Sequence, residues 1–103
     1  MAQRNRRIVW TAQAQLALSE ALDYIAQDSV DGTRAVLIQA LAAASALETL
    51  SERGRIVPEL GNPSVREVFV FRYRLLYEVG DVEVRILAFI HGAQDFARWR
   101  YSE

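Results

Sequence analysis

The apolar pattern of the chain changes at Gly54, and this change limits the fold more than any other feature of the sequence. Residues 12–51 are rich in alanine and leucine, and their apolar side chains recur every three or four positions, as on one face of an α-helix. After Gly54, β-branched and aromatic side chains alternate with polar ones, as on β-strands. Helices followed by strands predict an α+β domain, in which helices pack on one face of an antiparallel sheet.

The first half of the chain begins with a well-marked helix. Thr11 is a suitable N-cap for a helix over residues 12–27, because its hydroxyl can accept from a backbone N–H of the first turn. Along this segment Leu18, Leu22 and Ile25 fall on one face. The spacing predicts an amphipathic helix that packs through this face.

A second helix follows a polar turn at residues 28–32. Asp31 is placed to cap this helix, which is expected over residues 33–51 and contains many alanines. Small side chains allow two helices to approach closely. The sequence therefore predicts an antiparallel helical hairpin.

The remaining segments predict strands and a short C-terminal helix. Three of them form an antiparallel meander, whereas Pro58 keeps the segment that contains it out of the centre of a sheet. The fold class is therefore α+β, with an N-terminal strand, an antiparallel helical hairpin, a three-stranded antiparallel meander and a short C-terminal helix, in a single domain over residues 1–103. The predicted strands are residues 6–10, 55–58, 65–71, 72–79 and 82–90, and the C-terminal helix or tail covers 94–103.

Residues 82–90 show the most regular alternation of the chain. Successive side chains of a strand point to opposite faces of the sheet, so strict alternation assigns each residue to a face. The same rule places Tyr73 and Leu75 on one face of the preceding strand, with Arg72 and Arg74 opposite. In the last strand the expected faces are Val82, Val84, Ile86, Ala88 and Ile90 on one side, and Glu83, Arg85, Leu87, Phe89 and His91 on the other.

The composition excludes several kinds of site. The chain contains no cysteine, so neither a disulfide nor a thiolate metal site is available, and His91 is the only histidine. We therefore expect no metal and no cofactor. No segment has the length of a signal peptide's apolar region or of a membrane span, which predicts a soluble cytoplasmic protein that does not contact a membrane.

All twelve basic residues are arginine, and the net charge is −1. Without lysine, a basic site must use the guanidinium group, which is planar, forked and permanently charged. A protein that binds nucleic acid through bulk electrostatics usually carries a clear excess of positive charge. The charge balance therefore disfavours that class of protein.

The order of the elements and several motifs resemble the ParE-like toxins of the RelE/ParE superfamily, the plasmid-stabilisation type of toxin–antitoxin system. The resemblance covers about nine-tenths of the chain and rests on the order and spacing of the motifs together. One position departs from the pattern: such toxins typically end with His-Gly-x-Arg-Asp, and this chain has Gln94 in place of the arginine. The matching segments are residues 8–27, Gly54 to Glu59, Val65 to Glu67, Tyr73 to Val79 and Ile90 to Asp95.

The resemblance implies a toxin that is neutralised by a cognate ParD-like antitoxin. In such pairs the C-terminal segment of the antitoxin folds onto the toxin, giving a hetero-oligomer. The alanine-rich second helix and the edge of the sheet are the expected docking surfaces. Members called ParE act on DNA gyrase, whereas RelE-like members cut mRNA in the ribosomal A site, and the shared fold does not choose between them.

Cleavage of RNA would require a base for the 2′-hydroxyl proton, a cation for the phosphate and an acid for the leaving oxygen. Alternation allows Arg72, Arg74 and His91 to share one solvent-exposed face. The simpler alternative is that the arginines form ordinary surface ion pairs and that His91 binds local backbone. The candidates are Glu59 or Glu67 as base, Arg66, Arg72 or Arg74 on the phosphate, His91 as acid and Tyr101 stacked on a base.

A toxin that blocks gyrase needs only a binding surface and need not be an enzyme, which agrees better with the absence of lysine. The expected contacts with a target or partner are Arg72, the outward pair Leu87 and Phe89, and the aromatic residues of the tail. For Phe96 and Trp99, an equal alternative is that their side chains cap the core. A third hypothesis, suggested by Gln94, is a non-toxic binding module with the same fold. The tail aromatics are Phe96, Trp99 and Tyr101.

Overall fold

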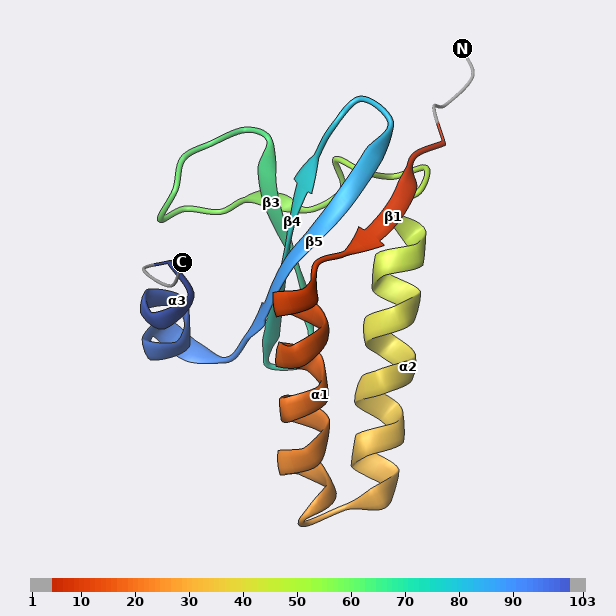
Figure 1. Cartoon of the computed structure of the whole chain (residues 1–103), viewed down its shortest axis with the longest axis vertical. Helices are drawn as coiled ribbons and strands as arrows, with labels where there is room; N and C mark the ends of the chain where they lie inside the picture. The colour runs from red at the N-terminus through yellow and green to blue at the C-terminus, as the bar shows by residue number, and fades with distance from the viewer. Residues whose placement is uncertain (1–4, 101–103) are drawn as a thin grey trace.

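The computed structural model describes residues 5–100, apart from the side chains of Ala93 and Gln94. The predicted α+β class and the order of elements are confirmed (Figure 1). Within the described residues, no helix combines the length and apolar character needed to cross a membrane. The elements are β1 (Arg7–Trp10), α1 (Ala12–Ala26), α2 (Val30–Ala46), β2 (Arg55–Ile56), β3 (Val65–Val70), β4 (Tyr73–Val79), β5 (Glu83–Ile90) and α3 (Gly92–Arg100).

The helical hairpin forms as predicted, but α2 begins and ends earlier than expected. The Thr11 hydroxyl caps α1 by accepting from the backbone N–H of Ala14 at 3.1 Å. The cap of α2 is Ser29, whose hydroxyl accepts from Gly32 N at 2.8 Å, so the expected cap Asp31 was wrong. Asp31 lies in the first turn, where a carboxylate still interacts favourably with the positive end of the helix dipole.

The five strands form one sheet in the order β1-β5-β4-β3-β2. The meander β3-β4-β5 is antiparallel, β1 pairs in parallel with β5, and β2 is an edge strand beside β3. β2 lies at the edge of the sheet, as expected from Pro58, which is the second residue after this strand. The far half of the hairpin α1–α2 extends past the end of the sheet (Figure 1).

The sheet has two differently covered faces. The helix face packs against α1 and α2 and contributes to the larger apolar cluster. The opposite side, here called the open face, carries a smaller cluster that α3 and the loop after β2 cover in part. On the helix face the buried strand residues are Val70, Leu75, Tyr77, Val84, Ile86 and Phe89, and on the open face they are Val65, Leu76, Ala88 and Ile90.

A β-bulge at Leu87 breaks the alternation expected for the last strand. Leu76 pairs with Ala88 and Tyr77 pairs with Ile86, so Leu87 has no partner on β4. An extra residue in one strand moves every following side chain to the other face. The expectation of one apolar face over residues 82–90 was therefore wrong beyond Ile86.

Candidate functional site

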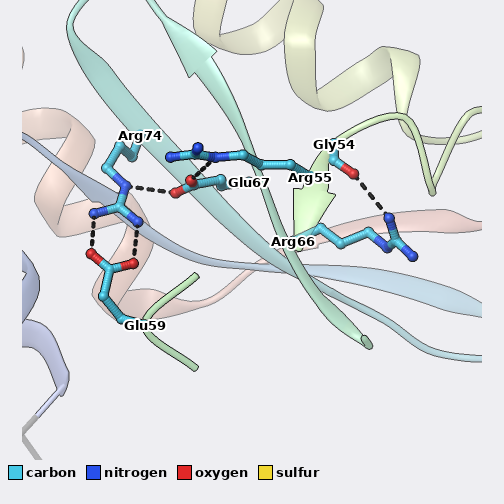
Figure 2. A network of polar contacts seen from close by, with 6 residues as sticks. All are labelled: Gly54, Arg55, Glu59, Arg66, Glu67 and Arg74. Carbon is cyan, nitrogen blue, oxygen red and sulfur yellow. Dashed lines mark hydrogen bonds and ion pairs between the residues drawn. The ribbon is translucent and has the colours of Figure 1, made fainter. Parts of the chain in front are cut away.

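Glu67 is a buried carboxylate at the centre of a polar network on the open face. Alternation in β3 places it beside Phe69 on that face, and its side chain has an exposed fraction of 0%. Its Oε2 accepts from Arg55 Nε at 2.6 Å, and its Oε1 accepts from Arg74 Nε at 2.6 Å (Figure 2). The Arg55 guanidinium also lies 5.3 Å from the centre of the Phe69 ring. Two guanidinium partners offset the cost of burying this charge.

Arg74 uses all three of its guanidinium nitrogens on carboxylates. Besides Nε on Glu67, its two terminal nitrogens donate to the carboxylate of Glu59 at 3.0 and 2.8 Å, in the bidentate geometry that suits this pair (Figure 2). The hydrogen bonds to Glu59 and then to Glu67 raise the pKa of Arg74. Its guanidinium carbon lies 5.0 Å from the centre of the Phe96 ring. Arg74 therefore connects two segments to the sheet: the loop after β2, through Glu59, and helix α3, through Phe96.

Gly54 fixes the position of β2 beside this network. Its N–H donates to the buried Tyr77 hydroxyl at 3.0 Å, and its carbonyl accepts from Arg66 at 3.0 Å. A Cβ at position 54 would lie 2.5 Å from the carbonyl oxygen of Glu67, so only glycine allows this approach. Arg55 follows directly and is thereby placed beside Glu67.

The network is electrically balanced, with two arginines and two glutamates. The hydrogen bond from Arg74 lowers the pKa of Glu59 below its ordinary value, which makes this carboxylate a weaker base. Each of the three Arg74 guanidinium nitrogens already donates a hydrogen bond to a carboxylate oxygen. Over residues 5–100, no group of three or more histidine and acidic side chains is positioned to hold a metal ion.

His91 lies on the other side of the sheet from Arg74. Its ring is tilted against the Tyr73 ring with the centres 5.1 Å apart, and its backbone N–H donates to the Asp95 carboxylate at 3.3 Å. The expectation of a shared face for Arg72, Arg74 and His91 was wrong, because the bulge at Leu87 turns the end of β5 over. The backbone contact of His91 agrees with the simpler alternative for this residue.

The structure brings only part of the proposed nuclease group together. Glu59, Glu67 and Arg74 are in mutual contact, whereas Arg66 points away from them (Figure 2). The Arg66 guanidinium instead donates to backbone carbonyls, including that of Pro63 at 3.2 Å. Of the other candidates, Arg72 is exposed in the β3–β4 turn, His91 is across the sheet, and Tyr101 lies outside the described residues.

A groove of about 730 Å³ lies between α1 and α3, over the end of β5. Its floor includes Tyr73 and Phe89, whose rings stack with their centres 4.7 Å apart. Burial raises the pKa of the Tyr73 hydroxyl. The volume of the groove falls within the range of roughly 300–1,000 Å³ that is usual for ligand sites. The lining residues are Gln13, Leu16, Ala17, Glu20, Ala21 and Tyr24 of α1, Tyr73, Ala88, Phe89, Ile90 and His91 of the sheet, and Asp95, Arg98 and Trp99 of α3.

The expected partner-binding residues are distributed differently from the prediction. Phe89 is not on an outward face, because the bulge turns it into the core beneath α1, where only 4% of it is exposed. Phe96 is buried in the smaller cluster, and Trp99 packs beside it with the ring centres 5.5 Å apart, so both cap the core. Leu87 is half-buried, and Arg72 is exposed in its turn.

The groove depends on residues that the sequence prediction passed over. Leu16 and Tyr24 of α1 are 60% and 69% exposed, and both line the groove. Their spacing of eight positions, with Ala17 and Ala21 between them, marks a second apolar stripe beside the one identified from Leu18. Arg55 was also missed as a partner of Glu67, because the two are separated by twelve positions in the sequence.

Solved structures include one with the same arrangement of elements. The chain superimposes on a structure described as the chromosomal ParDE TA system from P. aeruginosa with a TM-score of 0.69 and 18% sequence identity. The match covers 85% of this chain and 97% of that chain, and at this identity it establishes the shared fold. No curated protein sequence matches the chain.

The sequence itself establishes the family. Residues 8–96 match the model of the family described as the ParE toxin of type II toxin-antitoxin system, parDE. Because this match covers most of the chain, the protein belongs to the ParE toxin family. The resemblance inferred from the motifs is confirmed.

Proposed function

We propose that the chain is the toxin of a type II toxin–antitoxin pair, that it inhibits DNA gyrase by binding, and that a cognate ParD-like antitoxin neutralises it in a hetero-oligomer. Membership of the ParE toxin family supports the toxin assignment. In this proposal residues 1–103 act as one domain in the cytoplasm, and the chain is not an enzyme.

The observation that favours binding over RNA cleavage is that all three nitrogens of Arg74 are engaged by carboxylates. A nuclease needs a cation that is free to meet the phosphate, together with a base and an acid that reach the same bond. Arg74 is instead only 12% exposed and is held by Glu59 and Glu67. His91, the candidate acid, lies on the opposite face of the sheet. These positions support a structural role for the network.

For contact with the target, the proposal retains the residues of the predicted set that a partner can reach. Arg72 is exposed at the β3–β4 turn, and Trp99 is partly exposed on α3. Phe96 contributes by supporting Trp99 from below, and Phe89 by supporting Tyr73, because both are buried.

The test is induced expression of the chain without antitoxin, followed by assays of DNA supercoiling by purified gyrase and of mRNA integrity. Growth arrest with inhibited supercoiling and intact mRNA is expected. Two variants extend the test, since Glu59→Gln and His91→Ala remove the candidate base and acid without changing the core. Both should keep their toxicity to within about twofold, a factor that corresponds to a small free-energy change.

Other outcomes point to the alternatives. Ribosome-dependent cuts in mRNA that disappear in both variants would establish a RelE-like nuclease. Normal growth at a high level of folded protein would leave only the non-toxic binding module.

A further inference from the structure

The two-residue turn between β3 and β4 places a phenylalanine where the backbone disfavours one. Val70 pairs with Tyr73, so Phe71 and Arg72 alone form the turn. Phe71 has a φ of 54°, and in the described part of the chain it is the only residue other than glycine with a positive φ. In this region the Cβ of an L-residue lies too close to a carbonyl oxygen, so glycine, asparagine or aspartate is the usual residue. The turn itself therefore does not account for Phe71.

Packing within the chain does not account for Phe71 either. The residue is 62% exposed and belongs to neither apolar cluster. Its ring makes no stacking or cation–π contact with another described residue. Single exposed apolar side chains are common on protein surfaces, but a bulky residue in a left-handed conformation also costs free energy. A side chain that is unfavourable in both respects indicates a contact outside the chain.

Arg72 provides an available charge next to this ring. It is exposed, and among the described residues it forms no hydrogen bond, ion pair or ring contact. Arg55 and Arg74, in contrast, are both held by Glu67. A free guanidinium is a forked donor that matches the geometry of a carboxylate. Phenylalanine and arginine are both enriched at the contact surfaces between proteins.

We propose that Phe71 and Arg72 anchor the chain to its target protein: the Phe71 ring enters an apolar pocket of the target, and the Arg72 guanidinium pairs with a carboxylate beside that pocket. The inference rests on the proposed function, which already counts Arg72 among the contacts with the target. It adds Phe71 and the chemistry of the site that receives both side chains.

The residues on either side of the turn hold it in position. Val70 is 3% exposed and packs in the larger cluster, and the Tyr73 ring stacks on Phe89 with the centres 4.7 Å apart. The turn therefore extends from two strand ends that are fixed by the core. Binding through a segment that is already ordered loses little conformational entropy. An aromatic side chain presented in this way is typical of the few residues that dominate the free energy of binding.

A protein suits this anchor better than a nucleic acid does. Binding to a phosphate backbone requires several cations along one surface, and Arg72 is the only charged residue of the turn. Tyr24 of α1 and Tyr73 line the same groove, and α1 contains two carboxylates and no basic residue. The surroundings of the turn would therefore repel a phosphate backbone. A single arginine beside an apolar ring is complementary to one carboxylate beside an apolar pocket.

The experiment measures inhibition of DNA supercoiling by purified gyrase, with the full chain and its variants. Phe71→Gly should raise the half-inhibitory concentration at least about tenfold, because the anchoring ring is lost. The same substitution relieves the backbone strain, so its melting temperature should rise, and misfolding then cannot explain the loss of inhibition. Val82→Gly is the matched control: Val82 is 71% exposed in the turn between β4 and β5, at the other end of β4, and its inhibition should stay within about twofold.

The charge is tested separately with Arg72→Ala, with Arg53→Ala as control. Arg72→Ala should weaken inhibition several-fold, because it leaves the carboxylate of the target unpaired. Arg53 is also exposed and forms no ion pair with the residues that the structure describes, but it lies near Tyr77, towards the other end of β4. Inhibition by Arg53→Ala should stay within about twofold.

The outcomes separate this inference from the proposed function. If the unchanged chain does not inhibit gyrase, both fail. If it does, but Phe71→Gly inhibits as strongly as Val82→Gly, only the assignment of the turn is overturned. Phe71→Gly that inhibits gyrase normally but no longer binds the antitoxin would place the turn in that interface, and so would also overturn it. Binding of duplex DNA alone by the unchanged chain, lost in Arg72→Ala, would overturn the choice of a protein partner.

Discussion

The helix face of the sheet is covered by two long helices, whereas the open face is covered by a loop and the short helix α3. On the helix face the packing is almost entirely apolar. On the open face a few apolar residues share the surface with Glu67, Arg74 and their partners. Every buried side-chain nitrogen and oxygen that the structure describes has a hydrogen-bond partner. A network of ion pairs therefore holds the covering segments in place where few apolar contacts are available.

The surfaces that a partner could bind do not follow the distribution of the charged residues. The open face has the residue types usually associated with active sites, but they satisfy one another. The groove beside α1, with Leu16 and Tyr24 exposed, lies at the end of β5 and is lined from both faces, by Tyr73 and Phe89 of the helix face and by Ala88 and Ile90 of the open face. The comparison teaches that residue type alone does not indicate which surface is free to bind a partner. The hydrogen bonds that a side chain already makes within the molecule, and its exposure, indicate this better.

The largest expected effect compares two neighbouring leucines that are both completely buried. Leu75 packs on the helix face and Leu76 on the open face. Leu75→Ala should lower the free energy of unfolding by about 4 kcal/mol and Leu76→Ala by about 2–3 kcal/mol, because the loop and α3 can close over a cavity more easily than two packed helices can. Urea denaturation measures both, and a larger loss for Leu76→Ala would reverse the comparison.

Removal of the buried charge tests the role of the ion pairs. Glu67→Gln keeps the shape of the side chain but leaves two guanidinium groups facing an amide, so the free energy of unfolding should fall by about 2 kcal/mol. Glu78→Gln is the control, since Glu78 is partly exposed and its nearest pair with Arg85 is 3.6 Å long. The control should lose less than about 1 kcal/mol. Equal losses in thermal unfolding would mean that the network does not hold the open face.

Acid should weaken the outer part of the same network. The pKa of Glu59 is lower in the folded chain than its ordinary value of 4.5, so its stabilising effect is complete above that value and is lost as the pH falls through the folded pKa. Glu59→Gln should therefore cost up to about 1 kcal/mol near neutral pH, a limit set by its partial exposure, and almost nothing in strong acid. Denaturation of both proteins over this pH range is the measurement. A difference that grows on acidification would have the wrong sign.

The smallest effect is expected in the exposed turn between β3 and β4. Phe71 has a φ of 54°, in the left-handed region that glycine adopts without strain. Phe71→Gly should raise the free energy of unfolding by about 0.5 kcal/mol, because relief of strain exceeds the added entropy of the unfolded chain. In contrast, Phe69→Gly should be destabilising, since Phe69 lies within β3. Calorimetric melting temperatures distinguish the two.

Much of the fold could be predicted from local patterns. The period of Leu18, Leu22 and Ile25 and the alternation after Gly54 correctly gave the hairpin and the meander. The polar network around Glu67 was harder to predict, because a buried glutamate cannot be distinguished from a surface glutamate in the sequence. The partners of Glu67 come from β2 and β4, and only the tertiary structure brings them together.

The bulge shows why even a regular strand pattern was insufficient. Leu87 is a common strand residue, and nothing in its type marks it as unpaired. Ser29 and Asp31 present a similar problem, since both are good helix caps and only the backbone conformation distinguishes them.

Leu87 also determines which side chains share a face of the sheet at the end of β5. Ile90 pairs with Arg74, and the next residue, His91, lies on the opposite side of the sheet. By geometry alone, deletion of Leu87 would turn the end of β5 over and bring an imidazole to the face of Arg74 and Glu59. A single-residue deletion, with no change of composition elsewhere, thus separates this sheet from one in which an acid, a base and a guanidinium share a surface.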